Sequence, residues 1–576
     1  MDDKYLRSMN GLSWIDWTVM LGTLFTIVAY GVWKTRGTKN IEGYLLGGKE
    51  SNWWTIGLSV MATQASAITF LSTPGQAYME GMGFVQFYFG LPLAMIVIST
   101  VFIPLYYKLK VYTAYEFLES RFDNKTRLLT ASLFLLQRGL AAGITIYAPA
   151  IILSQILSIE LNYTIFFIGG LVIIYTVSGG TKAVSQTHKQ QMGVIFLGMF
   201  IAAGFLISYL TDTMSFSEGI QVAGVMDKME VIDWNFDPGS RYNIWSGILG
   251  GFFLQLSYFG TDQSQVQRYL SGSSIRESRL GLMFNGLLKI PMQFFILFVG
   301  ILLFLFYQFV MPPLHFNAEN VEMVKQSEYA IQYEALEEKQ QIVFDAKKDL
   351  ILEFNENPED QELKSAIQAY HVEEQALMKD SKALILKADP NASTEDDDYI
   401  FITFVTNFLP IGLIGLLLAV IFSAAMSSTS AELNALASTT TIDIYKRNIK
   451  QDGDEKHYLL RSKLFTFMFG ILAIIFAVMA DLFDNLIEAV NILGSLFYGT
   501  ILGVFLVAFF FKKVKGNAVF IAALISQAII IVLYTLNKYE YINLAYLWYN
   551  LIAPGLVIGF AVLIQVIGKE KPIKSK

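Results

Sequence analysis

Apolar runs long enough to cross a lipid bilayer recur almost without pause along this chain, from Trp14 to Ile567. The hydrocarbon core of a bilayer is about 30 Å thick, and a helix needs about 20 mostly apolar residues to cross it. The composition agrees, because 54% of the residues are hydrophobic and only 16% are charged, whereas soluble domains are about 25% charged. The sequence therefore predicts an all-α polytopic membrane protein.

Thirteen such runs are predicted along the chain. They cover residues 12–33, 53–76, 82–107, 126–157, 161–178, 190–211, 242–270, 280–310, 401–441, 461–480, 484–511, 516–537 and 541–568. The acidic opening "MDDKY" does not resemble a cleavable signal peptide, so the first run is expected to be retained. Lys and Arg crowd into alternate short loops, such as "KTRGTKNIEGYLLGGK" after the first run and "KKVK" after the eleventh. Basic loops stay in the cytoplasm, which predicts an N-terminus outside, a C-terminus inside, and a multi-pass protein of the plasma or inner membrane.

The runs suggest a domain organisation with one polar interruption. We expect an extra N-terminal span and cytoplasmic loop over residues 1–52, a first repeat over 53–241, a second repeat over 242–512, and two peripheral spans with a tail over 513–576. Between 313 and 399 the chain is rich in Glu, Asp, Lys and Gln, with apolar residues at helical spacing. This segment predicts an external helical hairpin inserted into the second repeat, either a solvated appendage without chemistry or a part with a role of its own.

Several function classes are excluded or disfavoured by residue content. The chain has no cysteine, so disulfides, thiolate metal sites and cysteine nucleophiles are excluded. Its four histidines are scattered and neither H-E-x-x-H nor a nucleophile elbow occurs, so an enzyme is not expected. A transporter-like sensor would need a cytoplasmic signalling domain, so this class is disfavoured. Nothing in the sequence indicates binding to nucleic acid or to a protein partner. A passive channel stays open as an alternative to a transporter of a small-molecule substrate.

One predicted span continues into the polar stretch "AAMSSTSAELNALASTTT", residues 424–441. At helical periodicity Ser427, Ser430 and Asn434 share one face, with Ser428 beside them. Hydroxyl and carbonyl oxygens suit a hard cation such as sodium, as they suit calcium and magnesium. Small and hydroxylated residues are also the usual material of close helix packing in membranes, so a purely structural role is the alternative.

Two other spans look interrupted. Residues 57–76, "GLSVMATQASAITFLSTPGQ", carry polar residues before a Pro-Gly pair, and residues 244–268 contain three glycines followed by polar and aromatic residues. Broken helices at corresponding points of two halves are typical of transporters built from inverted repeats, with the substrate at the midplane. Freed carbonyls at Ala62 and Ala65 could then meet the Ala424 carbonyl and the Ser427 and Ser428 hydroxyls around one sodium ion. Glycines that serve only helix packing are the alternative.

Four stretches resemble signature sequences of the sodium/solute symporter family, in order along the chain. They are "YTAYEFLESRF" (112–122), "SGGTKAV" (178–184), "GTDQSQVQRYLS" (260–271) and "SSTSAELNALASTTTIDIYK" (427–446). Two more, "ITIYAPAIILSQIL" (144–157) and "NFDPGSRYNIW" (235–245), are similar to the branch that carries iodide, monocarboxylates and vitamin carboxylates. The resemblance covers about residues 12–515 and implies the LeuT-like five-plus-five inverted-repeat fold, with sodium as the co-transported ion.

The resemblance also implies site residues. The family's principal sodium site falls on Ala62, Ala65, Ala424, Ser427 and Ser428. Tyr258 matches an aromatic residue that closes the inner gate, and Lys289 in "FNGLLKIPM" matches a lysine near the sugar site, although a lysine that snorkels to the interface is the alternative. The full set of expected substrate-binding residues is Gln64, Ser66, Thr69, Tyr88, Gln255, Tyr258, Lys289 and Asn491.

Departures from the family pattern bear on the substrate. The bacterial sugar carriers of this family place asparagine, glutamine and glutamate where this chain has Gln64, Thr69 and Tyr88. Sugar hydroxyls need several donors and acceptors, and the carboxylate among those residues is missing here. A small organic anion needs fewer partners, such as one cation and a positive half-helix end. The sequence therefore favours an organic monocarboxylate or a similar anion, with a sugar or sialic acid as the alternative.

His188, in "VSQTHKQQMG", stands where family members with an additional sodium ion usually have aspartate. Since imidazole is not a hard oxygen ligand, we expect at most one sodium ion, bound at the principal site. His188 could titrate near neutral pH and bring protons into the coupling. A histidine at the end of a loop, facing the cytoplasm, is the alternative.

Overall fold

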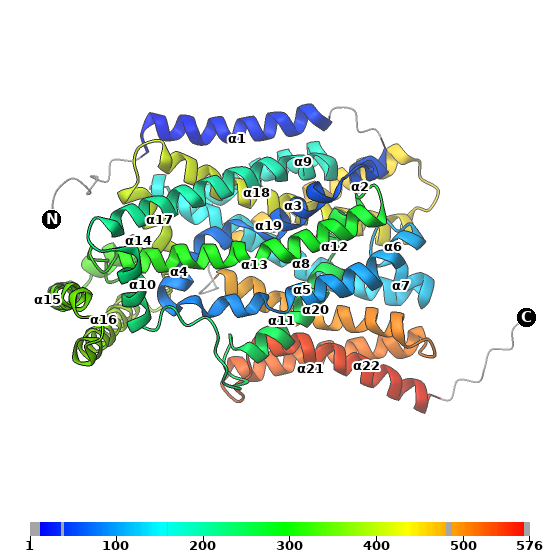
Figure 1. Ribbon diagram of the computed structural model, residues 1–576. Helices are drawn as coiled ribbons and strands as arrows, with labels where there is room; N and C mark the ends of the chain where they lie inside the picture. The colour runs from blue at the N-terminus through cyan, green and yellow to red at the C-terminus, as the bar shows by residue number, and fades with distance from the viewer. Residues whose placement is uncertain (1–11, 36–39, 158, 480–485, 569–576) are drawn as a thin grey trace, which may run out of the picture.

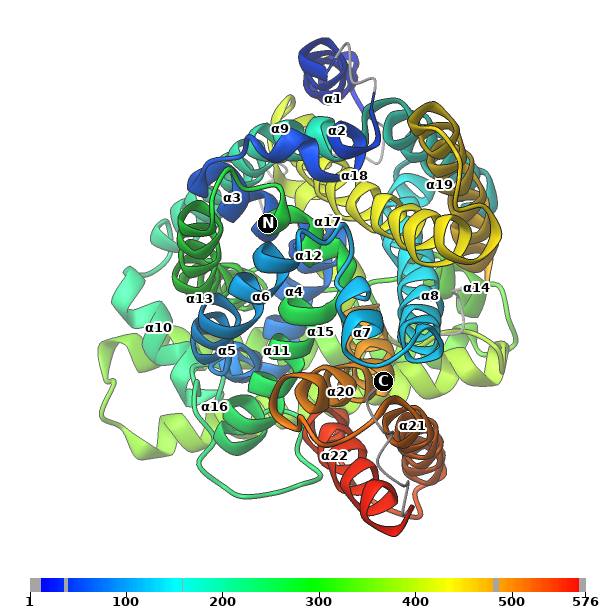
Figure 2. The same cartoon turned by 90° about the vertical axis from the view of Figure 1, so that its right-hand side faces the viewer.

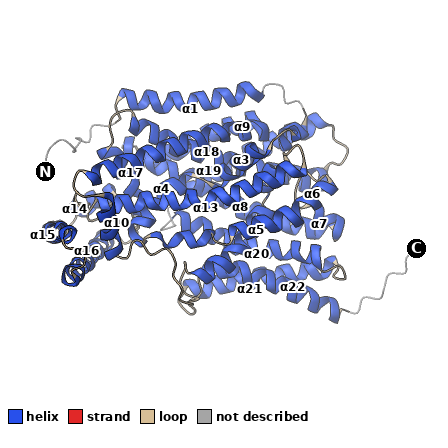
Figure 3. Ribbon diagram, viewed as in Figure 1, coloured by secondary structure: helices blue, strands red, loops and turns tan. Residues whose placement is uncertain are grey.

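The computed structural model describes residues 12–35, 40–157, 159–479 and 486–568. Within these ranges the chain is helical, without strands, and one isolated bridge pairs Ser51 with Gly272 (Figure 3). The prediction of an all-α protein is therefore confirmed for the described residues.

The elements of the first half of the chain are α1 (Trp14–Thr35), α2 (Ile41–Leu46), η1 (Gly47–Lys49), α3 (Trp53–Gln64), α4 (Ala67–Glu80), η2 (Met82–Tyr88), α5 (Leu91–Val97), η3 (Ile98–Phe102), α6 (Ile103–Leu109), α7 (Glu116–Arg121), α8 (Asn124–Leu157), α9 (Leu161–Thr211) and α10 (Phe216–Val225). Those of the second half are η4 (Ser246–Gly250), α11 (Gly251–Thr261), α12 (Gln263–Leu270), α13 (Ile275–Phe306), α14 (Ala318–Lys325), α15 (Ala330–Glu356), α16 (Gln361–Ala388), α17 (Asp397–Phe408), α18 (Leu413–Thr439), η5 (Thr440–Ile449), α19 (Glu455–Val478), α20 (Leu486–Phe510), α21 (Gly516–Lys538), η7 (Tyr546–Trp548) and α22 (Tyr549–Ile567). Eleven of these elements are helices of at least 19 residues, about the length that a bilayer crossing requires.

Ten helices of the described chain are long and apolar enough to cross a bilayer, and the bent α3–α4 pair gives an eleventh if it is one span. The count of thirteen stays a prediction. Two boundaries differ from those expected. The run 401–441 is divided between α17 and α18, because Gly412 takes a positive φ of 89°. The runs 161–178 and 190–211 form the single element α9, which turns at Gly180 with φ 60° and ψ −171°.

The long helices form one bundle, with α1 on one flank and α21 and α22 on the opposite flank (Figure 2). Helices α15 and α16 lie side by side as a hairpin that projects from one end of the bundle (Figure 1). Helix α1 begins at that end, and α22 ends at the other (Figure 1). The described chain therefore starts and finishes at opposite ends of the bundle (Figure 1).

Helix α13 runs parallel to the α3–α4 pair and contacts it near both of its ends. Gly281 near its start lies against Ile56, and Gly300 near its end lies against the Pro74 carbonyl. Small residues at these points let the two backbones approach closely, as is usual between membrane helices. This register fixes which residues of α13 face the interruption between α3 and α4.

Gly75 in α4 is another point of close approach. A Cβ atom there would lie 1.9 Å from the Asp397 carbonyl oxygen at the start of α17. Overpacking of this kind costs about 1–3 kcal/mol. We expect Gly75→Ala to lower the thermal unfolding temperature of the protein in detergent. Gly170→Ala is the matched control, since a Cβ at Gly170 meets nothing within 4 Å. Equal unfolding temperatures for the two variants would contradict the packing described here.

Buried charged side chains join α15 and α16 within the hairpin. Lys347 of α15 forms an ion pair with Glu374 of α16, and both side chains are buried. The His371 ring lies 3.6 Å from Glu374 through Nδ1 and meets the edge of Phe304 of α13 at 5.6 Å. Burial raises the pKa of Glu374, but the hydrogen bond with His371 and the charge of Lys347 outweigh it and hold the pKa below its ordinary value. Ionised Glu374 therefore stabilises the hairpin above the ordinary glutamate pKa, and this contribution is lost as the pH falls through the lowered value.

Lys228, in the segment after α10, lies beside this cluster. Its Nζ donates a hydrogen bond to the Met79 carbonyl at the end of α4 and lies 5.0 Å from the centre of the Phe304 ring. Burial lowers the pKa of Lys228 to about 8. The hairpin is thus tied to the same end of the bundle as the end of α4.

Removing Glu374 tests whether its ion pair with Lys347 holds α15 and α16 together. In Glu374→Ala the buried Lys347 ammonium loses its counter-ion, which costs about 3–5 kcal/mol when a buried pair is broken. We expect limited proteolysis to cut within 330–388 at a much higher rate than in the parent protein. Glu373→Ala, at the exposed neighbouring position, should leave the rate unchanged. Equal proteolysis rates for the two variants would show that the ion pair does not hold the hairpin together.

Candidate functional site

The first interruption predicted from the sequence is present. Helix α3 ends at Gln64, α4 begins at Ala67, and the two are bent by 62°. Ser66 precedes α4 in an extended conformation, and its side chain makes no capping hydrogen bond. The first N–H groups of a helix have no partner within it and carry a partial positive charge. The start of α4 is therefore a polar point inside an apolar bundle.

Helix α18 brings hydroxyl groups to the same region. The Ser427 hydroxyl donates to the Ala62 carbonyl at 2.9 Å and lies at the same distance from the Ala424 carbonyl. The Ser428 hydroxyl lies 3.1 Å from the Ala424 carbonyl. Each of these residues is at most 1% exposed. Two helices far apart in sequence thus place several oxygen atoms together, away from water.

Four of the five expected sodium-binding residues are therefore neighbours. Ala65 lies at the interruption itself, fully buried, and within the described chain no hydrogen bond joins its carbonyl to the serines. Oxygen atoms of this kind replace the hydration shell of a hard cation once the hydroxyl hydrogens turn away from the carbonyls. That these oxygens bind sodium stays a prediction.

His188 does not face the cytoplasm from a loop. It lies within α9 and is fully buried. Its Nδ1 is 2.9 Å from the Ser59 hydroxyl of α3, and its Nε2 is 3.1 Å from the Ser427 carbonyl. The loop interpretation is wrong because the chain resumes a helical course directly after Gly180, which carries His188 between α3 and α18. A role in proton coupling stays a prediction.

A cavity of about 320 Å³ lies near this histidine. It is lined by Gly47, Glu50, Ser51, Lys182, Ser185 and Gln186. The Ser59 hydroxyl lies 3.3 Å from that of Ser185 and 2.9 Å from His188. Polar contacts therefore connect this cavity with Ser427.

Lys289 lies beside the interruption between α3 and α4. It comes eight residues after Gly281, and Gln64 comes eight residues after Ile56, so the parallel register places both at one level. Lys289 is 0% exposed, and in the described chain its ammonium group has no hydrogen-bond partner. Its Nζ lies 5.4 Å from the centre of the Tyr88 ring. A lysine that snorkels to the interface would be exposed at its tip, so that alternative is wrong.

Two neighbours of this lysine are not among the site residues expected from the sequence. Asn285 and Gln293 of α13 lie one turn before and one turn after it, on the same face, and both are fully buried. Neither side-chain amide has a hydrogen-bond partner among the described residues, and the same holds for Gln255 of α11. Buried polar groups usually have partners, so a group of exceptions needs a reason. The four-residue spacing of two amides around a lysine in an apolar span was the available signal.

The other expected substrate residues are spread around the interruption. Thr69 of α4 and Tyr88 of η2 are buried, while Ser66 and Asn491 are half-buried. The structure thus brings Lys289 and Tyr88 of this set into contact.

The second interruption lies later in the chain than its glycines suggested. Helix α11 ends at Thr261, and Asp262, in an extended conformation, caps α12 by accepting from the Ser264 N–H. The glycines serve packing instead, because a Cβ at Gly247 or Gly251 would meet the backbone oxygen of Gln86 or Phe87. The packing alternative is therefore correct for the glycines, and the break is at Asp262.

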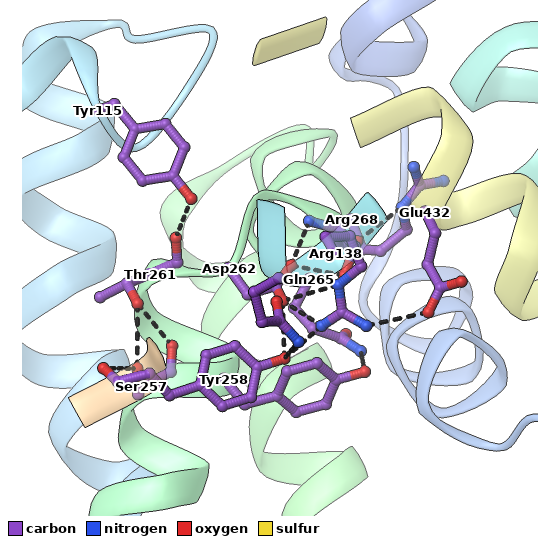
Figure 4. A network of polar contacts seen from close by, with 12 residues as sticks. Tyr115, Arg138, Ser257, Tyr258, Thr261, Asp262, Gln265, Arg268 and Glu432 are labelled. Atoms are coloured by element: carbon purple, nitrogen blue, oxygen red, sulfur yellow. Dashed lines mark hydrogen bonds and ion pairs between the residues drawn. The ribbon is translucent and has the colours of Figure 1, made fainter. Parts of the chain in front are cut away.

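Tyr258 belongs to a buried polar network at this second break (Figure 4). Its hydroxyl accepts from Gln265 at 2.6 Å, and its ring lies 5.3 Å from the Arg138 guanidinium of α8. Arg138 pairs with Asp262 and with Glu432 of α18, and it donates to the hydroxyl of Tyr498. The network joins α8, α11, α12, α18 and α20 at one point.

A model of the sodium:solute symporter family matches residues 44–331 and 383–526. The chain belongs to this family. The gap in the match, 332–382, falls in α15 and α16. The family resemblance inferred from the sequence is confirmed, and with it a multi-pass membrane transporter with sodium as the co-transported ion.

The relatives with known roles carry different solutes. A sodium/glucose cotransporter of Vibrio parahaemolyticus is 26% identical over 98% of this chain and 93% of its own length. A sodium/sialic acid symporter of Proteus mirabilis is 27% identical over 90% and 89%. The human sodium-coupled monocarboxylate transporter 1 is 34% identical, but over 47% of this chain and 44% of its own length.

A solved structure has the same fold. The structure of a sodium-coupled sialic acid symporter superposes with a TM-score of 0.73, covers 96% of this chain and 98% of its own, and is 24% identical in sequence. At this level of identity the likeness concerns the fold. The architecture of this symporter is therefore that of a sialic acid symporter, with the α15–α16 hairpin in the region that the family model omits.

Proposed function

We propose that this symporter uses sodium to import a small organic anion, most closely a monocarboxylate, across the plasma or inner membrane. The supporting observation is Lys289, a buried ammonium that has no hydrogen-bond partner among the described residues and lies at the level of the interruption between α3 and α4. The proposal includes thirteen spans in a five-plus-five inverted repeat, with the N-terminus outside and the C-terminus inside.

Sodium binds between α3 and α18 in this proposal. Its ligands are the carbonyl oxygens of Ala62, Ala65 and Ala424 and the hydroxyl oxygens of Ser427 and Ser428. Because the ion ties α18 to the broken helix, binding stabilises the arrangement in which the interruption is formed. The membrane potential contributes about 2.3 kcal/mol per charge per 100 mV to inward movement.

The anionic group of the solute binds between Lys289 and the start of α4. The ammonium supplies a full charge and the free N–H groups at the start of α4 supply a partial one. A buried charge without a partner is costly, so a lysine in this position favours a ligand that brings the opposite charge. Gln64, Gln255, Asn285 and Gln293 supply amides for other polar atoms of the solute.

Release follows a rocking movement of the bundle around the fixed site. The cavity lined by Glu50, Lys182 and Ser185 is the exit that we assign to sodium. The contacts from Ser185 through Ser59 and His188 to Ser427 mark this route.

A sugar or sialic acid is the second candidate. The similarity to the glucose and sialic acid symporters extends over nearly the whole chain, and four buried amides suit a hydroxylated solute. Sialic acid also carries a carboxylate, which Lys289 would accommodate. A neutral sugar would leave the Lys289 ammonium unpaired, which favours the anion.

Counterflow in proteoliposomes decides among these solutes. The purified protein is reconstituted and tested with labelled monocarboxylates, sugars, sialic acid and inorganic anions, with sodium and with potassium in its place. We expect sodium-dependent accumulation of an organic anion and none of a neutral sugar. Accumulation of a neutral sugar alone would contradict the anion assignment, and equilibration without dependence on sodium would indicate a channel.

A further inference from the structure

One arginine is shared by two carboxylates inside the bundle (Figure 4). Arg138 of α8 donates through Nε and Nη2 to Asp262 and through Nη1, at 2.9 Å, to Oε1 of Glu432. The exposed fractions of the three side chains are 3%, 1% and 5%. Helices α8 and α18 are both candidate membrane spans. Two carboxylates therefore compete for one guanidinium where charge is costly.

The two carboxylates are bonded very unequally. Oδ1 of Asp262 accepts from the Ser264 N–H and hydroxyl, and Oδ2 accepts from Arg138 and from the Tyr498 hydroxyl at 2.9 Å. Both oxygens of Asp262 are thus bonded to donors, as an ionised carboxylate requires. Within the described residues Arg138 donates to Oε1 of Glu432, and the buried Oε2 has no hydrogen-bond partner. The Thr145 hydroxyl lies near the Glu432 carboxylate, and it donates to the Ala141 carbonyl at 3.0 Å.

Other charged and titratable groups near Glu432 are already engaged elsewhere. Arg268 of α12 donates to the Ser264 carbonyl and to Gln267, on the side of α12 that faces His188. His188 of α9 bonds to Ser59 and Ser427. Arg138 and Asp262 act on the Glu432 carboxylate most directly, and Tyr258, Tyr498 and Arg268 belong to the same network (Figure 4). Within the described chain, Arg138 is the cation whose bond reaches the Glu432 carboxylate.

We infer that Glu432 is a proton-binding site, occupied while Arg138 is held by Asp262. A hydronium ion supplies the proton: one of its O–H bonds breaks, an O–H bond forms at Oε2, and a water molecule is left. The neutral acid removes the excess charge of two carboxylates around one arginine in an apolar bundle. This inference is independent of which solute is carried.

The position of Asp262 makes proton binding at Glu432 depend on the position of α12. Asp262 lies at the break between α11 and α12, so a movement of α12 away from α8 would take this carboxylate from Arg138. Glu432 would then be the only carboxylate on the arginine and would release its proton. The proton is thus bound or released according to the position of α12, which couples proton binding to the movement of the bundle.

Infrared spectroscopy of the purified protein in detergent, with protons as the ligand, tests the site. At neutral pH the parent protein is expected to show the carbonyl stretch of a buried, protonated carboxylic acid. Glu432→Gln, which resembles the neutral acid in shape, should lose it. Asp262→Asn should also lose it although Glu432 is present, because Arg138 then has Glu432 as its one ionised partner. Glu374→Gln, whose carboxylate is ionised in the hairpin, is the control and should retain it.

The same spectra can overturn the inference. If the difference between the parent protein and Glu432→Gln contains no carboxylic acid stretch at neutral pH, Glu432 holds no proton. If the stretch persists unchanged in Asp262→Asn, Asp262 does not control it. Neither infrared result depends on transport activity. The spectra can therefore contradict the proton site at Glu432 without contradicting sodium-coupled transport, and the counterflow assay can do the reverse.

Discussion

Lys289→Met is expected to raise the anion concentration for half-maximal sodium-dependent uptake by at least about 30-fold. Methionine keeps the volume and removes the charge at the level of the interruption between α3 and α4. Losing one partner of a buried, bonded charge pair costs about 2–5 kcal/mol, and each 1.4 kcal/mol corresponds to a factor of ten. The measurement is concentration-dependent uptake, in proteoliposomes, of the anion that counterflow identifies.

Two comparisons make this result specific. Lys538→Met, at an exposed position at the end of α21, removes an equal charge from the protein and should leave the uptake curve unchanged. Sodium binding without solute should be retained in Lys289→Met, since within the described residues Lys289 makes no hydrogen bond to Ser427 or Ser428. An unchanged anion affinity in Lys289→Met would show that the ammonium does not hold the solute.

Ser428→Ala is expected to raise the sodium concentration for half-maximal uptake by about 10- to 100-fold. A hydrogen-bonding group that contacts a charge contributes about 1.5–3 kcal/mol, and the missing hydroxyl leaves one coordination position of the ion empty. The solute affinity at saturating sodium should change much less. Sodium activation curves at fixed solute concentration give the measurement.

Ser423→Ala is the matched control for this substitution. Ser423 lies on the same helix, is equally buried, and has no hydrogen-bond partner within the described chain. Its replacement should not move the sodium activation curve. If Ser428→Ala behaves as Ser423→Ala does, the assignment of the sodium ligands is wrong.

Much of the site could be recognised in the sequence because its chemistry stands out in an apolar context. A lysine at 289 is rare inside a predicted span, and the stretch from 427 to 430 gathers three serines and a threonine directly after an apolar run. The break at 64–67 could be located because polar residues interrupt an apolar run there. Glycines were less informative, since the same residue serves a break and a close helix contact.

The residues that sequence reasoning missed owe their role to partners far away in the chain. Asn285 and Gln293 look like ordinary polar positions until the register of α13 against α3 and α4 places them around Lys289. Glu432 looks like one more polar residue of a hydroxylated helix until Arg138 and Asp262 meet it. The loop alternative for His188 is wrong because the kink at Gly180, after which the helix continues, is not visible in the local pattern.

The sequence by itself determined the class of the protein, the approximate spans and the family, and it predicted the sodium-binding oxygens, because these depend on local hydropathy and on the residue types at fixed spacings. The tertiary structure alone decided which polar groups face each other. That choice depends on how far one helix slides along another, and a shift of a few residues exchanges every contact without altering the hydrophobic pattern of either helix. The unpaired Lys289 and the shared Arg138 are consequences of those registers, and both proposals about function depend on them.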